Sequence, residues 1–384
     1  MGKWKMVKLG DVLVVLRNGI SVKQNKDGEG QKISRIESIA TGKFDINRVG
    51  YANLTTTEQE KYRLQLGDIL FSHINSPPHV GKTALFTHAE KVFHGMNLLL
   101  MRSGPKILPK YLDFYLKFLQ NAGFWKTRCK QSVNQASVNQ QDVKTVPIPL
   151  PPLDEQERIV AILDEAFAAI DTAVANTQKN LENAKELFEG YREGLFEAQD
   201  SWIQCQIGEC FKVRSGDFLS KKMMNKNGPY VVYGGNGPAG MHDASNLEDE
   251  NILIGRVGAK CGNVQYVNDS IWVTDNAFYV YDLQFDLNFQ FLAALLDQSN
   301  LGATANQTAQ PVISFKTIRS VEIAFPNNKE EQVEIMDDYE SMRQLVTDVQ
   351  TNWQQKLTLL AELKQSLLSR AFSGELTGAE VVEE

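Results

Sequence analysis

Two long stretches of the chain repeat apolar residues at alternating steps of three and four positions. The first runs from Leu153 to about Glu197, and the second follows Glu331. This spacing is the heptad pattern of a helix that packs along one stripe against another helix. Each helix is expected to span about 40 residues, on the order of 60 Å at ~1.5 Å rise per residue. The predicted seam of the helix pair comprises Leu163, Phe167, Ile170, Val174, Leu181, Phe188, Val346, Val349, Trp353, Leu360, Leu363 and Leu367.

A single apolar stripe of this length cannot be buried inside a small globule, so the simplest partner for each stripe is the other one. Lys356 stands in the second stripe where an apolar residue is expected. It either sets the register of the pair or marks a place where the seam is open. Gly190 and Gly194 lie one turn apart and lower helix propensity. They predict a close approach by another helix.

The remaining segments contain short apolar or alternating runs bounded by Gly, Asn or Pro, which are typical of strands. Residues 145–152 (TVPIPLPP) are expected to be extended, because proline lacks an amide donor and disfavours helix in its predecessor. Residues 108–119 have helical spacing. The segment before the first long helix is therefore predicted to be a mixed, strand-rich domain.

The same order of motifs occurs twice along the chain. Leu9-Gly10-Asp11 is matched by Ile207-Gly208-Glu209, and TVPIPLP at 145–151 is matched by SVEIAFP at 320–326. Gln156 and Phe196, near the ends of the first helix, are matched by Gln332 and Phe372 in the second. The chain is therefore an internal duplication of a globule followed by a long helix.

This duplication predicts an α+β fold with two strand-rich globular domains, separated by two long antiparallel coiled-coil helices and related by a pseudo-twofold repeat. The predicted boundaries are 1–152 and 200–327 for the domains, 153–199 and 328–376 for the helices, and 377–384 for an acidic tail. Two heads on a rigid spacer suit a split recognition site, whose gap the helix pair would set.

The charge distribution changes the picture that the net charge of −7 gives. Residues 1–150 hold 22 Lys and Arg against 11 Asp and Glu, a net charge of +11. Residues 151–200 hold 4 against 12, so the first helix is acidic. A basic domain favours contacts with phosphates, whereas the acidic helices suit a protein partner better than DNA. Residues 201–326 hold 9 against 12, so DNA would meet a local patch there.

Composition excludes several classes of protein. No run of 18 apolar residues occurs, and no apolar stretch follows Met1–Lys8 that could serve as a signal peptide, so a cytoplasmic protein without membrane spans is expected. The cysteines show no zinc-ligand spacing and are expected to be buried free thiols. Four of the five histidines lie in one stretch, which leaves a metal site open as an alternative, although no metal ligand is assigned. The cysteines are Cys129, Cys205, Cys210 and Cys261, and the clustered histidines are His73, His79, His88 and His94.

No catalytic residue is predicted. Asn75-Ser76-Pro77-Pro78-His79 differs from the NPPY loop of adenine N6-methyltransferases, because Asn does not directly precede Pro-Pro and no aromatic residue follows. His79-Val80-Gly81-Lys82-Thr83 resembles the end of a phosphate-binding loop but lacks its leading glycine, and a strand follows it. An enzyme with its own active site is therefore disfavoured against a binding subunit.

Four segments resemble the specificity subunit of type I restriction–modification enzymes: IPLPPLDEQERIVAIL at 148–163, YGGNGPAG at 233–240, ILIGRVGAKCGNV at 252–264 and LLSRAFSGELTG at 367–378. The resemblance extends over nearly the full length. The second copy departs from it, since FPNNKEEQVEIM at 325–336 lacks two of the prolines.

The resemblance implies a non-catalytic subunit that binds double-stranded DNA. It implies two target recognition domains, each of which reads one half of a bipartite site. The helices would set the spacer and dock two methyltransferase subunits, and a translocating endonuclease subunit would join them. S-adenosylmethionine, ATP and Mg would be bound by these partners, with no cofactor in this chain.

Candidate DNA contacts are polar or basic residues in loops at matching places of the two repeats. Arg and Lys can pair with guanine and Asn and Gln with adenine, while lysines more often hold phosphates. Arg256 is the strongest single candidate, since a charged group that leaves an apolar strand needs a partner. Asn236 is alternatively a turn residue, and Asn97 and Asn276 alternatively cap a strand. The candidates are Lys23, Lys26, Ser72, His73, Asn75, Lys82 and Arg102, then Lys221, Lys222, Tyr233, Asn236, Arg256, Lys260, Asn263 and Asn276.

Two other interpretations remain open at this point. One is a coiled-coil scaffold with two protein-binding heads, for which the +11 of residues 1–150 has no use. The other is the specificity subunit of a methylation-only system, which lacks the translocating partner. Neither the recognised bases nor the length of the gap follows from the sequence.

Overall fold

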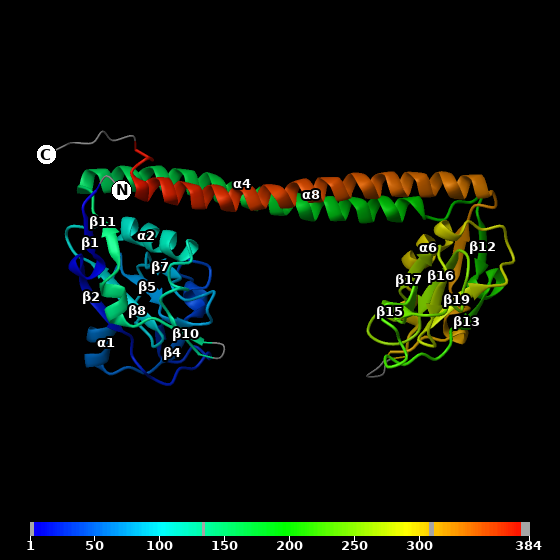
Figure 1. Ribbon diagram of the computed structural model, residues 1–384, viewed down its shortest axis with the longest axis horizontal. Helices are drawn as coiled ribbons and strands as arrows, with labels where there is room; N and C mark the ends of the chain where they lie inside the picture. The colour runs from blue at the N-terminus through cyan, green and yellow to red at the C-terminus, as the bar shows by residue number, and fades with distance from the viewer. Residues whose placement is uncertain (1–3, 133–134, 307–310, 378–384) are drawn as a thin grey trace. The chain divides into compact units, whose positions relative to one another are not determined.

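The computed structural model describes residues 4–132, 135–306 and 311–377. The chain divides into two compact units. Unit 1 comprises Met1–Thr177 with Gln354–Glu384, and unit 2 comprises Gln178–Trp353. Each unit therefore combines one strand-rich domain with part of each long helix (Figure 1).

Unit 1 is built around a four-stranded antiparallel sheet in the order β2-β8-β5-β7. Its strands are β2 (Leu13–Asn18), β8 (Leu98–Ser103), β5 (Ile69–Ser72) and β7 (Thr83–Leu85). Two smaller sheets pair β1 (Met6–Lys8) with β11 (Pro147–Pro149) and β3 (Gln31–Ile33) with β4 (Gly50–Ala52). In a third, β10 (Gln135–Ser137) lies between β6 (Ile74–Asn75) and β9 (Lys130–Ser132). The helical elements are η1 (Leu9–Asp11), η2 (Glu37–Ile39), η3 (Ile46–Arg48), α1 (Thr56–Tyr62), α2 (Pro109–Asn121) and α3 (Gln140–Lys144).

The central sheet of unit 1 is buried on both faces. Successive side chains of a strand point to opposite faces. Ile69 and Phe71 of β5 accordingly join one apolar cluster, whereas Leu70 joins another. The first cluster includes α2, the beginning of the first long helix and the end of the second. The domain is therefore fastened to both helices by its own hydrophobic core.

Unit 2 repeats this plan. Its central sheet has the order β13-β19-β16-β17, with β13 (Lys212–Ser215), β19 (Ala277–Tyr281), β16 (Asn251–Gly255) and β17 (Val264–Val267). The other strands are β12 (Ile203–Gln206), β14 (Tyr230–Gly234), β15 (Gly237–His242), β18 (Ile271–Val273) and β20 (Glu322–Phe325). β12 pairs with β20, and β14 lies between β15 and β18. The helical elements are α5 (Ile207–Cys210), α6 (Phe289–Gln298), η4 (Leu301–Thr304) and α7 (Phe315–Ile318).

A buried glutamine anchors each domain to the beginning of one long helix. The Gln156 side-chain oxygen accepts a hydrogen bond from the backbone N–H of Leu108 at 2.9 Å, ahead of α2. The Gln332 oxygen accepts one from Asn288 at 2.8 Å, ahead of α6. Each amide nitrogen also donates to the carbonyl oxygen of a proline just before its helix. Both glutamines are fully buried, so the two repeats share this anchor.

The long helices are α4 (Leu153–Leu195) and α8 (Lys329–Ser373), and they pack together antiparallel. In unit 1, Glu155 near the beginning of α4 bonds Thr377, whereas Asp171 further along bonds Lys364. In unit 2, Phe188 of α4 stacks on Tyr339 of α8. The predicted fold class, with two strand-rich domains and two packed helices, is confirmed.

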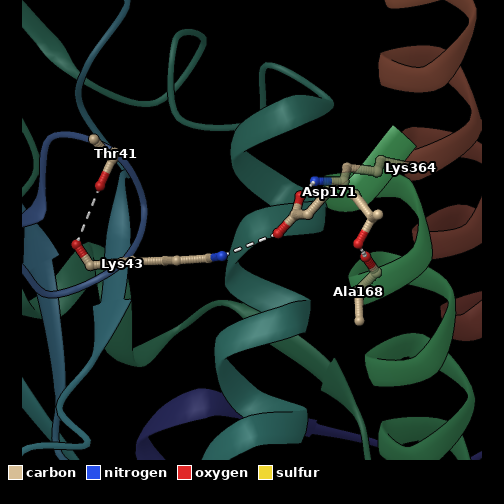
Figure 2. A network of polar contacts seen from close by, with 6 residues as sticks. Thr41, Lys43, Ala168, Asp171 and Lys364 are labelled. Atoms are coloured by element: carbon tan, nitrogen blue, oxygen red, sulfur yellow. Dashed lines mark hydrogen bonds and ion pairs between the residues drawn. The ribbon is translucent and has the colours of Figure 1, made fainter. Parts of the chain in front are cut away.

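Asp171 joins three parts of unit 1. Its carboxylate accepts hydrogen bonds from Lys364 on α8 and from Lys43, which lies between η2 and η3, the latter at 2.9 Å (Figure 2). Lys364 also lies 5.4 Å from the centre of the Phe167 ring. The Lys364 hydrogen bond holds the pKa of the Asp171 carboxyl below its ordinary value, and Lys43 adds to this effect. The network links the domain to both helices at one carboxylate.

The predicted seam of α4 is buried or half-buried along its length, but the seam of α8 shifts after Trp353. Leu363 is 46% exposed, so its predicted place in the seam is wrong. Lys356 is also exposed, whereas Leu357 and Lys364 are half-buried. The step after Trp353 is four residues, which puts Lys364 opposite Asp171.

Two further expectations fail. A Cβ added to Gly190 or Gly194 would meet no atom within 4 Å among the described residues, so no close helix approach explains these glycines. Cys205 of β12 and Cys210 of α5 form a disulfide, with their Cα atoms 7.0 Å apart. Only Cys129 and Cys261 are free thiols, and Cys129 is half-buried.

Candidate nucleic-acid interface

Four of the candidate residues in unit 1 gather where β5 ends. The backbone N–H of Ser72 donates to the carbonyl oxygen of Lys82 at 2.8 Å, and the Asn75 side-chain amide donates to the Ser72 hydroxyl at 3.0 Å. The Lys82 ammonium donates to the Ala40 carbonyl oxygen at 3.0 Å. His73 follows Ser72, and both are buried. Much of this polarity therefore holds the turn between β5 and β7 together.

A groove of about 520 Å³ opens beside His73. It lies where the ends of β2 and β5 meet β10 and the beginning of α3. Among the described side chains that line it, none is a lysine, an arginine or a carboxylate, and most are amides or hydroxyls. We call it the unit 1 groove, and its lining is Asn18, His73, Ile74, Ser137, Val138, Asn139, Gln140 and Gln141.

His73 forms part of the wall of this groove and is largely buried. The side chain is 8% exposed, and its Nδ1 has no hydrogen-bond partner within the described part of the chain. Burial lowers the pKa of His73 to about 4, against a smaller opposite effect of the Asn97 backbone. Burial likewise lowers the pKa of the neighbouring His94 to about 3. Both imidazoles are therefore neutral at physiological pH.

The other unit 1 candidates lie elsewhere. Arg102 donates two hydrogen bonds of 2.7 Å to the buried carboxylate of Asp68, which raises the pKa of the guanidinium. Asp68 precedes β5 and Ser72 ends it, so about 13 Å of strand separate the two sites at ~3.3 Å per residue. Lys23 and Lys26 are exposed in the segment between β2 and β3. The candidate residues of unit 1 therefore lie in three separate places.

Three turns meet in unit 2 and bring its candidates together. In the orientation that satisfies its neighbours, the Asn263 amide donates to the carbonyl oxygens of Gly235 at 2.9 Å and Lys260 at 2.8 Å. The backbone N–H of Arg256 donates to the Asn276 carbonyl oxygen at 2.9 Å. A Cβ on Gly255 would lie 2.1 Å from the Gly235 carbonyl oxygen, so this approach requires glycine.

Around this junction, Asn236 and Asn276 are exposed and Tyr233 is half-buried. Asn276 donates its side-chain amide to Asp275 at 3.3 Å. Lys260 is exposed. Asn97, at the matching place in unit 1, adopts a left-handed backbone conformation with φ of 72°. This conformation is one that asparagine tolerates better than most residues, so the structural alternative accounts for Asn97.

Arg256 is held inside unit 2. One guanidinium nitrogen donates to the Ser215 hydroxyl at 2.6 Å and to the Asp275 carbonyl oxygen at 2.8 Å. The guanidinium carbon lies 4.7 Å from the centre of the Phe278 ring, within the range of a cation–π contact. The partner that the sequence requires for this charge is therefore supplied by the domain itself.

Lys221 and Lys222 are exposed in the segment between β13 and β14. Two large apolar side chains flank them, Phe218 at 70% exposure and Met223 at 56%. This segment is the local basic patch that the charge count requires if unit 2 is to meet a polyanion. The sequence identified the lysines and missed the apolar side chains beside them.

The chain matches the type I restriction modification DNA specificity domain over residues 1–183 and 199–357. It belongs to this family. The two matched segments follow the internal duplication, since each contains one strand-rich domain and the beginning of one long helix. The predicted family is confirmed.

Relatives of this DNA specificity family give the same picture. The chain is 36% identical over 286 residues to the putative type I restriction enzyme MjaX specificity subunit of Methanocaldococcus jannaschii, covering 71% of this chain and 64% of that protein. It is 29% identical over 184 residues to the type I restriction enzyme EcoKI specificity subunit of Escherichia coli, covering 47% and 39%. The match thus spans less than two thirds of these relatives' lengths.

Solved structures share the fold of this family member. The HsdS subunit from Thermoanaerobacter tengcongensis superposes with a TM-score of 0.60 at 18% identity, covering 97% of both chains. A chain from a structure on complex assembly and conformational transition of the type I R-M system reaches a TM-score of 0.76 at 19% identity, covering 98% of both chains. At these identities the likeness concerns the fold.

Two further observations concern the described residues of this DNA specificity chain. No three His, Cys, Asp or Glu side chains within them lie together as a metal site, so the clustered histidines are not gathered around a common centre. None of the described helices combines the length and the apolar character that crossing a membrane requires.

The amides of the unit 1 groove are the residues that sequence reasoning missed. Asn18 lies more than 100 positions before Gln140, so no local pattern joins them. One signal was present: residues 137–141 (SVNQQ) are neutral and mostly hydrogen-bonding, within a domain rich in lysine and arginine.

Proposed function

We propose that this chain is the DNA specificity subunit of a type I restriction–modification assembly. The domain of residues 1–152 reads one half of a bipartite DNA site, and the domain of residues 200–327 reads the other. The long helices set the gap and seat two methyltransferase subunits, which translocating endonuclease subunits join. Catalysis and the binding of S-adenosylmethionine, ATP and Mg belong to these partners.

The observation that carries the proposal is the equivalent fastening of two domains to one helix pair. Gln156 anchors unit 1 at the beginning of α4, and Phe372 near the end of α8 packs on Tyr115 of α2. Gln332 anchors unit 2 at the beginning of α8, and Phe196 just after α4 packs on Phe291 of α6. Each domain thus meets one helix beginning and one helix end, as a protein that presents two similar heads requires.

Charge supports DNA as the ligand of the heads and protein as the ligand of the helices. The +11 of residues 1–150 attracts phosphates, whereas residues 151–200 carry three times as many acidic as basic residues. Acidic helix surfaces repel a duplex but leave room for a basic protein surface.

The test is methylation by the assembled complex. The chain is combined with its methyltransferase subunits and S-adenosylmethionine, and modified adenines are mapped by single-molecule sequencing on a library of random duplexes. We expect one bipartite motif with a fixed gap. Modification without sequence preference, with salt held constant, contradicts the proposal.

A second arm tests the helices as spacer. One added heptad in each helix, after Thr177 and before Gln354, keeps the seam in register while lengthening the pair by about 10 Å at ~1.5 Å per residue. The gap should then change by about three base pairs at ~3.4 Å each, with both half-sites unchanged. A matched variant with glycine-rich inserts, which break the helices, should lose a defined gap.

A further inference from the structure

The unit 1 groove is electrically neutral within a strongly basic domain. Residues 1–150 carry a net charge of +11, yet the side chains described along the groove are amides, a hydroxyl, two aliphatic groups and a neutral imidazole. Phosphates are held mainly by lysine and arginine, so a surface that binds only the DNA backbone has no reason to exclude them. A surface that reads adenine through amides needs no such charge.

His73 forms part of the wall of this groove as a largely buried imidazole. Its imidazole is 8% exposed, and no group in the described residues bonds its Nδ1. Because burial keeps the ring neutral, His73 adds no positive charge that would favour a phosphate in the groove.

The groove also carries the side chains that distinguish bases. Asn and Gln amides form paired hydrogen bonds with N6 and N7 of adenine, and apolar groups contact the thymine methyl. Asn18 and Gln141 are exposed at the rim, while Ile74, which is half-buried, supplies apolar surface. This set is suited to an A·T base pair.

We propose that the unit 1 groove hydrogen-bonds base edges of double-stranded DNA and reads an A·T pair in one half-site, with Asn18 and Gln141 as specificity-determining residues. The inference rests on the proposed function, which requires that this domain contact DNA. It goes further by naming the place and the chemistry of readout.

Unit 2 fills the matching positions differently. Arg256 replaces His73, Ser215 replaces Asn18, and Arg256 bonds Ser215 at 2.6 Å. Phe315 and Lys316 begin α7 where Gln140 and Gln141 begin α3. Amide readout at this position is therefore a property of unit 1, and its loss should affect one half-site alone.

The test uses the full assembly with its methyltransferase subunits. Bound duplexes are selected from a random library at fixed salt and sequenced, for the unaltered chain, for Gln141→Ala and for Asn18→Ala with Gln141→Ala. Both side chains are exposed, so the fold is expected to persist. The control is Asn121→Ala, an exposed amide at the end of α2 that lies outside the groove.

We expect the groove variants to lose roughly tenfold discrimination at an A·T position of one half-site, with the other half-site and the gap unchanged. The control should keep the full motif. Unchanged motifs in the groove variants overturn the inference and leave the proposed function standing. Uniformly weaker binding to every sequence also overturns it, since the groove would then hold the backbone. If the unaltered assembly selects no sequence, the proposed function fails and the inference fails with it.

Discussion

His73 of unit 1 and Arg256 of unit 2 occupy equivalent backbone positions, but their side chains make different contacts. The backbone carbonyl of His73 accepts from Val138, and that of Arg256 accepts from Ile313, each at 2.9 Å, just before α3 and α7. In unit 1 a neutral ring lines a groove, whereas in unit 2 the guanidinium of Arg256 donates a hydrogen bond to Ser215. Equivalent backbones thus present different chemistry.

A second pair of equivalent positions also differs in side-chain chemistry between the two units. At the far end of the central sheet, Asp68 and Arg102 form a bidentate ion pair in unit 1. In unit 2 the matching residue of Asp68 is Asn251, whose side chain bonds the backbone N–H and carbonyl oxygen of Val280 at 3.0 and 3.1 Å. An ion pair and a neutral amide therefore do one structural task.

The two repeats differ in side-chain chemistry at the ends of their strands. Strand pairing and the buried side chains of Gln156 and Gln332 determine the shared backbone fold. They supply hydrogen bonds to buried backbone groups that cannot be left without partners. The strand ends carry side chains whose partners lie within one domain. Such positions can change without disturbing the rest, as the proposed recognition of two separate half-sites requires.

Acid should separate the two units most strongly. His73 and His94, with pKa values of about 4 and 3, are neutral in the folded state but take up a proton below about 6.5 when unfolded. The unfolded state therefore binds more protons, and stability falls as pH falls from about 6.5 toward 4. At ~1.4 kcal/mol per pH unit for each histidine, unit 1 should lose about 4 kcal/mol by pH 5.

Hydrogen exchange of the central strands measures this loss within one sample. Protection of β5 and β8 should fall with pH well before that of β16 and β19, because Arg256 and Val273, rather than histidines, stand at the matching positions. His73→Gln should remove about half of the loss in unit 1. Parallel loss in both units would show that carboxylates common to the two domains dominate instead.

Breaking the ion pair between Asp68 and Arg102 should have the next largest effect on the stability of unit 1. Arg102→Leu leaves the fully buried Asp68 carboxylate without its cation, which should destabilise unit 1 by about 3 kcal/mol. Chemical denaturation followed by exchange of β5 amides reports the change. Adding Asp68→Asn, which imitates Asn251 of unit 2, should restore part of the loss, and a loss near zero for Arg102→Leu would mean that solvent screens the pair.

The sequence was sufficient for the architecture, because heptad spacing and internal duplication are local or self-referential patterns. It was insufficient where two local patterns compete. After Trp353, both Lys356–Leu363 and Leu357–Lys364 offer a three-four stripe. The Asp171 carboxylate favours the second by pairing with Lys364, and that contact links residues 193 positions apart.

The candidate site was predictable only in part for the same reason. Loop positions at matching places of the repeats selected Tyr233, Arg256 and Asn263 of unit 2, but their meeting at one junction was not predicted. The unit 1 groove arises from the pairing of β10 with β6 and from the approach of Asn18, which are long-range contacts. Charge reasoning also selected Arg102, which is paired with Asp68, while the groove amides Asn18, Gln140 and Gln141 were missed.

The smallest expected effect comes from Arg256, the strongest candidate from the sequence. It shows whether this side chain stabilises unit 2 or reads bases. Arg256→Leu removes two hydrogen bonds and the contact with the Phe278 ring, so unit 2 should lose about 1.5 kcal/mol. His73→Leu, the matched change, should alter unit 1 by well under ~1 kcal/mol at pH 8, because the described residues give Nδ1 no bond to lose. Unfolding of each unit by denaturant, followed by exchange, compares the two.

The same pair of variants then separates the roles on DNA. If Arg256 is structural, the Lys variant, which keeps the charge but lacks the planar fork, should lose stability without changing the selected bases. Unchanged stability in Arg256→Leu together with a relaxed half-site would instead make Arg256 a reader of bases. In that case the guanidinium must leave Ser215 on binding, and the two matched positions would serve one purpose by different chemistry.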